Sequence, residues 1–289
     1  MFIKRGFFIM CQALFVVFSL ALNAAYPQKG QSQTKSVDEY LSRLPAELKL
    51  EKKVPQKYHM TSYWNNRDVS GNTAGRIRIT GEFTRSLKDD QVDCLWNNVR
   101  IARASGPSKP FPESELLDYM EDFSYTLSGE IMKEEFYKDF PDTDVRNIIK
   151  TLIWDAPMIE VVYMSLDNLT YNKTFRSTDF EGMTIQMANF ALIKMRDLRL
   201  TWTGLSKRNG EVCALIQYKS FSNPVYSKTD AMNIKGRSCY WGSFLVSLED
   251  KRVKYVALNE DIILEMEFPN DSVKRLINIQ REVEFENIQ

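Results

Sequence analysis

Strands are the elements that the pattern of hydrophobic and polar positions predicts most often, and they fall in two regions. In the first region, which begins near Tyr58, Ile77, Ile79 and Phe83 alternate with polar neighbours. The second region covers residues 184–285 and shows the same two-residue period along most of its length. Successive side chains of a strand point to opposite faces of the sheet. This period is therefore typical of strands that bury one face and expose the other.

Turn residues divide the second region into hairpins. Asn209-Gly210 predicts a type I′ turn, because both central positions of that turn need a positive φ. Three further strands are predicted over residues 239–248, 253–258 and 262–268, with turns near Glu249-Asp250 and Asn259-Glu260. Connections this short join antiparallel neighbours, so these three strands are expected to form a meander.

Helices are predicted between the two strand regions, over residues 113–154, where the apolar period lengthens. The apolar faces of three helices there are Leu116, Tyr119, Met120 and Phe123, then Met132, Phe136 and Phe140, then Val145, Ile148, Ile149 and Leu152. Pro157 is expected to limit the third helix. A short helix is also predicted before the first strand region, where Ser36 and Glu39 form a capping box.

This order of elements predicts an α+β fold. We expect a large curved antiparallel sheet, open and half-barrel-like, with the helical insertion 113–154 packing on one face. The sheet and insertion form a single domain over residues 61–289, after a linker and short helix at 26–60. In element order alone, the chain resembles the open β half-barrels with covering helices of bacterial lipoprotein and lipid carriers.

The first 25 residues have the pattern of a secretory signal peptide. Lys4 and Arg5 precede an apolar run at 7–22, and the small residues Ala24 and Ala25 follow it. An uncleaved membrane anchor is the alternative, and membrane contact would then be limited to this segment. Export to the periplasm or the exterior is expected in either case.

Balanced charge narrows the classes of function. The 289 residues include 38 Lys and Arg and 38 Asp and Glu, so the net charge is zero. Nucleic-acid-binding proteins generally carry a basic excess, so that class is not expected. The single histidine leaves no multi-histidine metal site, and neither a metal nor a cofactor is expected.

The three cysteines after the leader have two interpretations. Cys213 and Cys239 lie in neighbouring predicted strands and are the favoured disulfide pair, and Cys94 would then be the odd thiol. The alternative is three buried thiols that pack as small hydrophobic side chains.

Nucleophilic catalysis has little support in the sequence. Ser238 lies in a Gly-Arg-Ser-Cys-Tyr stretch that lacks the second glycine of a nucleophile elbow, and no histidine follows it. His59 is better interpreted as a structural or exposed residue than as the partner of Cys94. Carboxylates are the remaining enzymatic candidates. Asp261, Glu265 and Glu267 share one face of a predicted strand, where they suit either a hydrolase or a solvated sheet face.

Aromatic residues point to binding. Trp96, Phe123, Trp154, Trp202 and Trp241 are candidates to line an apolar cavity between sheet and helices, although core packing is the usual role of such residues. The leading hypothesis is an exported, non-enzymatic binding or carrier protein whose ligand is a lipid or another apolar or amphipathic small molecule. An envelope scaffold that interacts with other proteins is the first alternative, and a carboxylate-based hydrolase is the second.

Overall fold

The structure is a computed structural model, and it describes Glu39 and residues 48–68, 70–141, 144–178, 181–187, 191–228, 232–269 and 274–288. All of these belong to one compact unit, Val37–Gln289. The predicted signal peptide lies outside the described residues, as does the predicted short helix apart from Glu39. None of the helices in the described part of the chain has the length and apolar character that a membrane crossing requires.

Thirteen strands of the described chain form one sheet. They are β1 (Gln56–Arg67), β2 (Thr73–Lys88), β3 (Gln91–Ala104), β4 (Glu115–Leu116), β5 (Phe123–Thr126), β6 (Thr174–Ser177), β7 (Thr184–Met187), β8 (Ala191–Lys194), β9 (Leu198–Arg208), β10 (Glu211–Lys228), β11 (Asn233–Ser247), β12 (Val253–Glu267) and β13 (Arg275–Asn287). The helices are α3 (Asp144–Asp155) and α4 (Pro157–Ser165), with 3-10 turns η1 (Asp118–Met120), η2 (Gly129–Met132), η3 (Glu134–Tyr137) and η4 (Leu166–Asn168).

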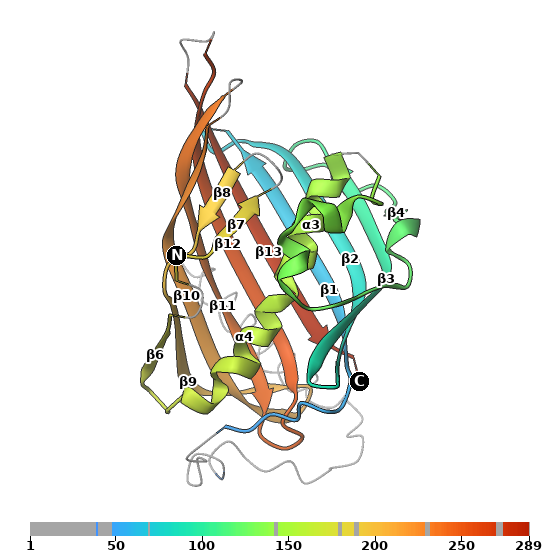
Figure 1. Cartoon of the computed structure of the whole chain (residues 1–289), viewed down its shortest axis with the longest axis vertical. Coiled ribbons are helices and arrows are strands. Elements are labelled where there is room, and N and C mark those ends of the chain that lie inside the picture. Colours follow the sequence, from blue (N-terminus) through green and yellow to red (C-terminus); the bar gives the residue numbers. More distant parts are fainter. Residues whose placement is uncertain are drawn as a thin grey trace, which may run out of the picture. The chain divides into compact units, whose positions relative to one another are not determined.

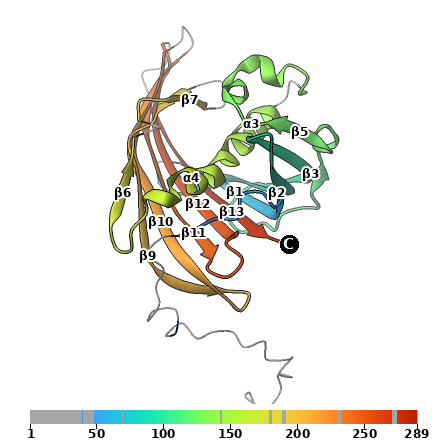
Figure 2. The same cartoon turned by 60° about the horizontal axis from the view of Figure 1, so that its bottom comes forward.

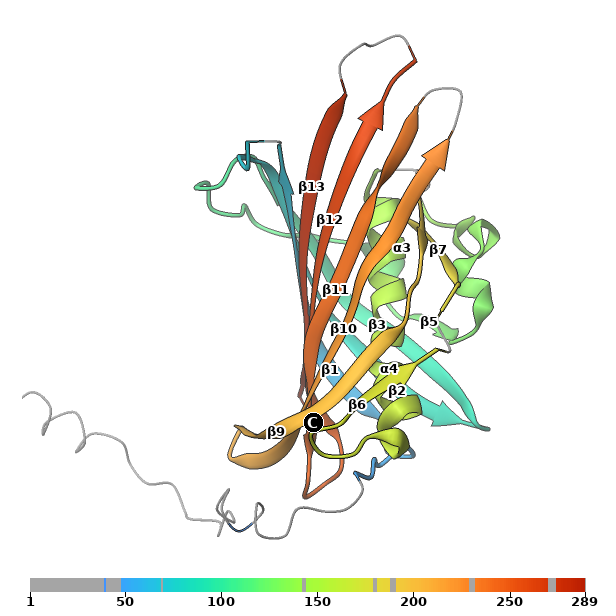
Figure 3. The ribbon, with the colours of Figure 1, turned by 90° about the vertical axis from the view of Figure 1, so that its left-hand side faces the viewer.

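The sheet is antiparallel and open. Its main order is β4-β3-β2-β1-β13-β12-β11-β10-β8-β7, while β5 pairs with β3, and β9 pairs with β10 and β6. Pairing of β1 with β13 joins the first strand region to the end of the chain. In Figures 1 and 2 the sheet curves around α3 and α4, which lie across one face. The side view in Figure 3 places both helices on that same side of the long strands β10 to β13. The predicted fold class is confirmed.

The predicted alternation positions the core. On β2, Ile79 and Phe83 are buried, and they belong to a core that also includes Ile149 and Ile153 of α3 and Ile159 of α4. The hairpin at Asn209-Gly210 is confirmed, with φ values of 51° and 87° that fit a type I′ turn. On β2, the two-residue period therefore correctly predicted the strand and the side of it that faces the helices.

The prediction of helices at residues 113–140 is wrong. This segment forms the short strands β4 and β5 and 3-10 turns, and the α-helical part of the insertion starts at Asp144. β5 pairs with β3, which places Phe123 opposite Trp96 and satisfies backbone groups along that edge. Ser128 and Gly129, both weak helix formers, interrupt the segment. Tertiary pairing therefore overrides the helical spacing of the apolar residues.

Pro157 limits α3 as predicted, since α3 ends at Asp155, but it also begins a second helix that the sequence pattern did not predict. It occupies the first turn of α4, where proline fits because the missing N–H would have no partner inside the helix. The third predicted helix is confirmed as α3, and α4 follows it after Ala156. The helical layer therefore extends to Ser165, beyond the predicted end at residue 154.

The predicted turn at Asn259-Glu260 is wrong as well. β12 continues through both residues, with Glu260 opposite Tyr240 of β11 and Arg281 of β13. The backbone there is paired on both sides, and the Glu260 side chain is buried beside Arg281. A buried carboxylate with a cation partner replaces the surface turn that the sequence pattern indicated.

The three cysteines in the described chain are free thiols, so the favoured Cys213–Cys239 disulfide is wrong. Cys213 lies opposite Ser247 and Cys239 lies opposite Asp261, which places them at different heights on neighbouring strands. Burial raises the pKa of Cys94 to about 12 and that of Cys213 to about 11. Both therefore stay protonated near neutral pH and pack as small hydrophobic groups.

Candidate functional site

A cavity of about 120 Å³ lies between the helices and the sheet. Its walls come from β1, α3, α4 and strands β8 to β13, together with η2 and the chain around Met183 and Met195. The lining residues are Trp64, Met132, Thr151, Trp154, Asp155, Pro157, Met158, Val161, Met183, Ile193, Met195, Leu198, Ser220, Tyr240, Leu258, Glu260, Ile262 and Arg281. Most of this lining is apolar, and four of the residues are methionines.

Strand parity explains how the sheet side of the cavity is built. Leu258, Glu260 and Ile262 are alternate residues of β12, so all three point toward the helices. Arg281 occupies the corresponding inward position on β13, in the same series as Val283 and Phe285. At the cavity, the sheet therefore presents two charged side chains, Glu260 and Arg281, among apolar neighbours.

Arg281 forms ion pairs with two carboxylates. Its Nη1 donates to Glu260 and its Nη2 donates to Asp155, the last residue of α3. All three side chains are almost completely buried. The Ser238 hydroxyl donates to Glu260 Oε1 at 2.7 Å, and the indole ring of Trp64 lies 4.3 Å from the guanidinium carbon of Arg281. We call Asp155, Glu260 and Arg281 the carboxylate–arginine cluster.

Burial dominates the electrostatics of the carboxylate–arginine cluster. It raises the pKa of Asp155 to about 7, with Arg281 opposing and Glu260 reinforcing the shift. With both carboxylates ionised, the cluster has two negative charges and one positive charge. A proton on Asp155 removes the excess negative charge. Because the pKa of Asp155 is near neutrality, its carboxyl gains and loses this proton readily around pH 7.

The cluster also has an unused donor. Nε of Arg281 is buried and has no hydrogen-bond partner among the described residues. A buried polar group without a partner is costly, so a polar ligand atom that accepts from it would be favoured. The arrangement is chemically suited to holding a polar group next to an apolar one. No group of three or more His, Cys, Asp or Glu side chains in the described chain could hold a metal ion.

Of the five predicted ligand-binding aromatics, one lines the cavity. Trp154, near the end of α3, is in the wall, and its indole N–H donates to the Ile131 carbonyl at 2.8 Å. Trp96 and Trp202 are fully buried in the core, and Phe123 packs against that core from β5. Trp241 is 40% exposed, because it has the opposite strand parity to Tyr240, which faces the cavity.

The three predicted catalytic carboxylates lie on the opposite face of β12 from the cavity. Glu265 and Glu267 form ion pairs with Lys235 and Lys274, and Asp261 accepts a hydrogen bond from Asn278. The hydrogen bond from Lys274 is the main reason that the pKa of Glu267 falls to about 2. These contacts are those of a solvated sheet face.

The structure also tests the residues considered for nucleophilic chemistry, which are Ser238 and the possible pair of His59 and Cys94. Ser238 is buried and donates to Glu260. His59 is exposed on β1, whereas Cys94 is buried on β3, so strand parity places them on opposite faces. The structure therefore does not bring these side chains together.

Sequence reasoning missed the residues that make this cavity polar. Glu260 interrupts the inward series Leu258, Ile262 and Leu264, and Arg281 interrupts the inward series that includes Val283 and Phe285. The signal that would have identified them is a charged residue within a series of alternate strand positions that are otherwise apolar. Asp155 gave no such signal, because charged residues are common at helix ends.

A second buried arginine lies away from the cavity wall. Arg85 of β2 pairs with Glu160 of α4 at 2.5 Å and stacks on Tyr163, whose ring centre is 4.0 Å away. It also donates to the Lys52 carbonyl at 3.1 Å. We call Arg85 and Glu160 the helix-anchoring pair, because it joins α4 to the sheet.

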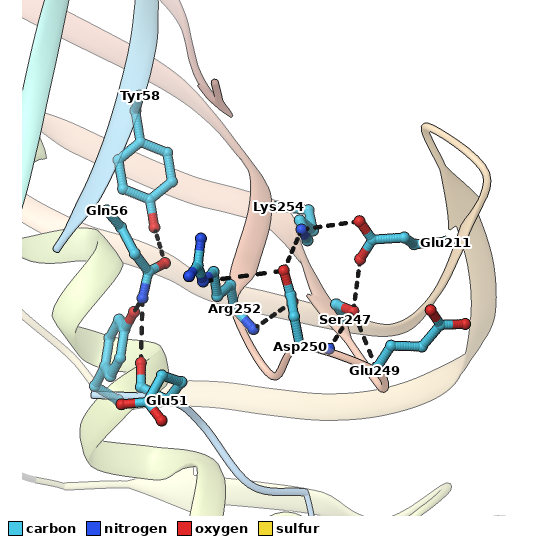
Figure 4. A network of polar contacts seen from close by, with 10 residues as sticks. Glu51, Gln56, Tyr58, Glu211, Ser247, Glu249, Asp250, Arg252 and Lys254 are labelled. Atoms are coloured by element: carbon cyan, nitrogen blue, oxygen red, sulfur yellow. Dashed lines mark hydrogen bonds and ion pairs between the residues drawn. The ribbon is translucent and has the colours of Figure 1, made fainter. Parts of the chain in front are cut away.

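A further network of polar contacts holds the chain near the start of β1 and the turn between β11 and β12. Figure 4 shows Gln56 between Tyr58 and the Glu51 backbone, beside the turn between β11 and β12. Lys254, at the start of β12, contacts Asp250 of that turn at 2.5 Å and Glu211 of β10 at 3.0 Å. These groups have partners within the network, so we interpret the network as structural.

Comparisons with known proteins give no family. No protein-family model matches the chain, and no curated protein matches it. A solved structure described as "Lipid-protein interactions in lipovitellin" aligns over 83% of this chain and 26% of its own, with a TM-score of 0.41 and 12% identity. The chain thus spans about a quarter of that structure's length. At this similarity, the function has to be argued from the chain's own residues.

Proposed function

We propose that this chain is a non-enzymatic binding or carrier protein for a small apolar or amphipathic ligand. The observation that carries the proposal is the cavity between α3, α4 and the inner face of the sheet, with its largely apolar lining. Clefts of this kind, with a few convergent polar groups, are the usual form of small-molecule sites. The ligand would lie between the sheet and the helices.

The size of the cavity limits the part of the ligand that is enclosed. A volume of about 120 Å³ is comparable to the ~150 Å³ of an engineered apolar cavity that binds benzene. It suits a ring or a short alkyl segment of a longer molecule. Met132, Met158, Met183 and Met195 allow adjustment, because unbranched methionine side chains repack easily around different shapes.

We also propose that the protein acts outside the cytoplasm. The support is the positive, apolar and small-residue order of residues 1–25. Mass spectrometry of the native protein should find an N-terminus close to residue 25. A mature chain that still begins at Met1 would contradict cleavage, and recovery in the cytoplasmic fraction would contradict export.

Binding can be tested with N-phenylnaphthylamine, a neutral probe that fluoresces in apolar surroundings. We expect a saturable signal with the wild-type protein. Met158→Trp fills the cavity from α4 and should weaken binding by at least about tenfold. The matched control is Met164→Trp on the same helix, where the side chain is 54% exposed and the substitution should leave binding unchanged.

The outcomes are distinct. Circular dichroism would confirm that both variants fold. No saturable signal in the wild type would overturn the binding proposal, and equal effects of the two substitutions would place the probe elsewhere. Organic extraction of the purified protein, followed by mass spectrometry, would then identify the natural ligand.

A further inference from the structure

We propose that the ligand of this cavity has a cationic amine head group, held by the carboxylates of Asp155 and Glu260 while its apolar part contacts the methionines and tryptophans. This inference rests on the proposed function and adds the chemical class of the ligand. The cavity, the buried cluster on its wall and the charge imbalance of that cluster support it.

The first step is the charge count. Arg281 supplies one positive charge against two carboxylates, and no other Lys or Arg of the described chain forms an ion pair with either carboxylate. The other cations of α3 are directed elsewhere, since Arg146 and Lys150 both pair with Glu134. The ionised cluster therefore has one negative charge in excess, and a buried charge without compensation is costly.

The second step is that a cation compensates this charge better than other head groups. An ammonium has donors for both carboxylates and no acceptor, so it complements the excess charge directly. An anionic head group would bring a third negative charge to one arginine. A neutral alcohol would leave the excess in place.

The third step concerns the geometry around the head group. Arg281 holds Glu260 from the neighbouring strand and Asp155 from α3, so both carboxylates are already positioned at the cavity wall. Trp154 adds an aromatic ring to the lining, and aromatic rings attract cations. Arg281 Nε, which has no partner among the described residues, is a donor and therefore does not bind the ammonium, which is held by the carboxylates alone.

The proposal predicts a pH dependence through Asp155. The groups that face it are Arg281 on β13, Glu260 on β12, and Tyr240 and Tyr218 on β11 and β10. Burial raises the pKa of both tyrosines well above the usual value, so they stay neutral. Asp155, whose pKa is about 7, loses its proton as the pH rises, and the ionised form favours the amine.

The test compares hexylamine, hexanol and hexanoate as competitors of N-phenylnaphthylamine. These ligands share one chain and differ in the head group, so differences in affinity report on the cluster. We expect hexylamine to bind most tightly. Its affinity should rise about tenfold from about pH 6 to about pH 8, because Asp155 must be ionised.

Asp155→Asn provides the matched test within the cluster. The amide still accepts from Arg281 and removes the excess charge, so the preference for the amine and its pH dependence should disappear. Asp261→Asn makes the same chemical change on the opposite face of β12 and should keep both.

The results separate the two proposals. If the probe binds but hexanol or hexanoate matches or exceeds hexylamine, the head-group inference is wrong and the binding function stands. If the amine is preferred and Asp155→Asn abolishes the preference, both proposals are supported. If neither the probe nor any competitor binds the wild-type protein, the binding function itself is overturned.

Discussion

Two buried arginines join the helices to the sheet, and they differ in what surrounds them. Arg85 and Arg281 both lie on inward strand positions, both pair with a helix carboxylate and both stack on an aromatic ring. Arg85 has one carboxylate partner, Glu160. Arg281 has two, Asp155 and Glu260, and lines the cavity.

This difference distinguishes a structural ion pair, that of Arg85, from a cluster at Arg281 whose charges are not balanced. The helix-anchoring pair is balanced, and Arg85 also donates to a backbone carbonyl. The carboxylate–arginine cluster is unbalanced and retains a donor without a partner in the described chain. A balanced pair is what anchoring a helix requires. An excess charge beside an apolar cavity is costly for the fold alone, and it is explained if a ligand neutralises it.

The largest expected effect is that of Arg281→Met. The change leaves Asp155 and Glu260 buried without their cation, which should cost about 3–5 kcal/mol of unfolding free energy. Urea unfolding at about pH 8 measures the loss. The cost should shrink in acid, where protons replace the arginine; a cost independent of pH would mean that charge is not its cause.

Arg85→Met should have a smaller effect, about 3 kcal/mol, because it strands one carboxylate and the Glu160 side chain keeps 12% exposure. The double variant Arg85→Met with Glu160→Met should recover most of the loss in the same urea experiment, since two apolar groups replace a balanced pair. If the double variant is less stable than the single variant, the pair contributes to the stability of the fold by more than the mutual neutralisation of its charges.

A graded effect is expected from pH alone. The folded-state pKa of Asp155 is raised from 3.8 to about 7, so the folded protein binds this proton more tightly than the unfolded chain does. This contribution to stability is complete below about pH 4 and is lost as the pH rises to about 7. Thermal unfolding of Asp155→Asn should lack this slope; an unchanged slope would assign it to another group.

The smallest effect is expected on the solvated face of β12. Glu265→Gln should leave the melting temperature unchanged within error, because exposed ion pairs such as those of Glu265 with Lys235 and Lys274 contribute little. Differential scanning fluorimetry at low and high salt measures the melting temperatures of the variant and the wild type. A clear loss of stability would mean that this face is involved in more than solvation.

Part of the fold and of the candidate site followed from local pattern. The period-two alternation correctly predicted which face of β12 carries Asp261, Glu265 and Glu267, and Asn209-Gly210 correctly predicted a hairpin. Residues 113–140 could not be predicted in this way. The pairing of β5 with β3 depends on a strand edge that the local sequence does not describe. The local sequence predicts a turn at Glu260, since the partner that makes its burial possible, Arg281, lies 21 positions away.

The sequence by itself determined the antiparallel class, the parity of the strands and the amphipathic helix α3, because these depend on neighbouring residues and their period. The tertiary structure decided the pairing of β1 with β13, the extension of the helical layer through α4 and which aromatic residues reach the cavity. It also brought Asp155, Glu260 and Arg281 together from α3, β12 and β13. Their charges act on one another only at short range, and only folding creates that proximity.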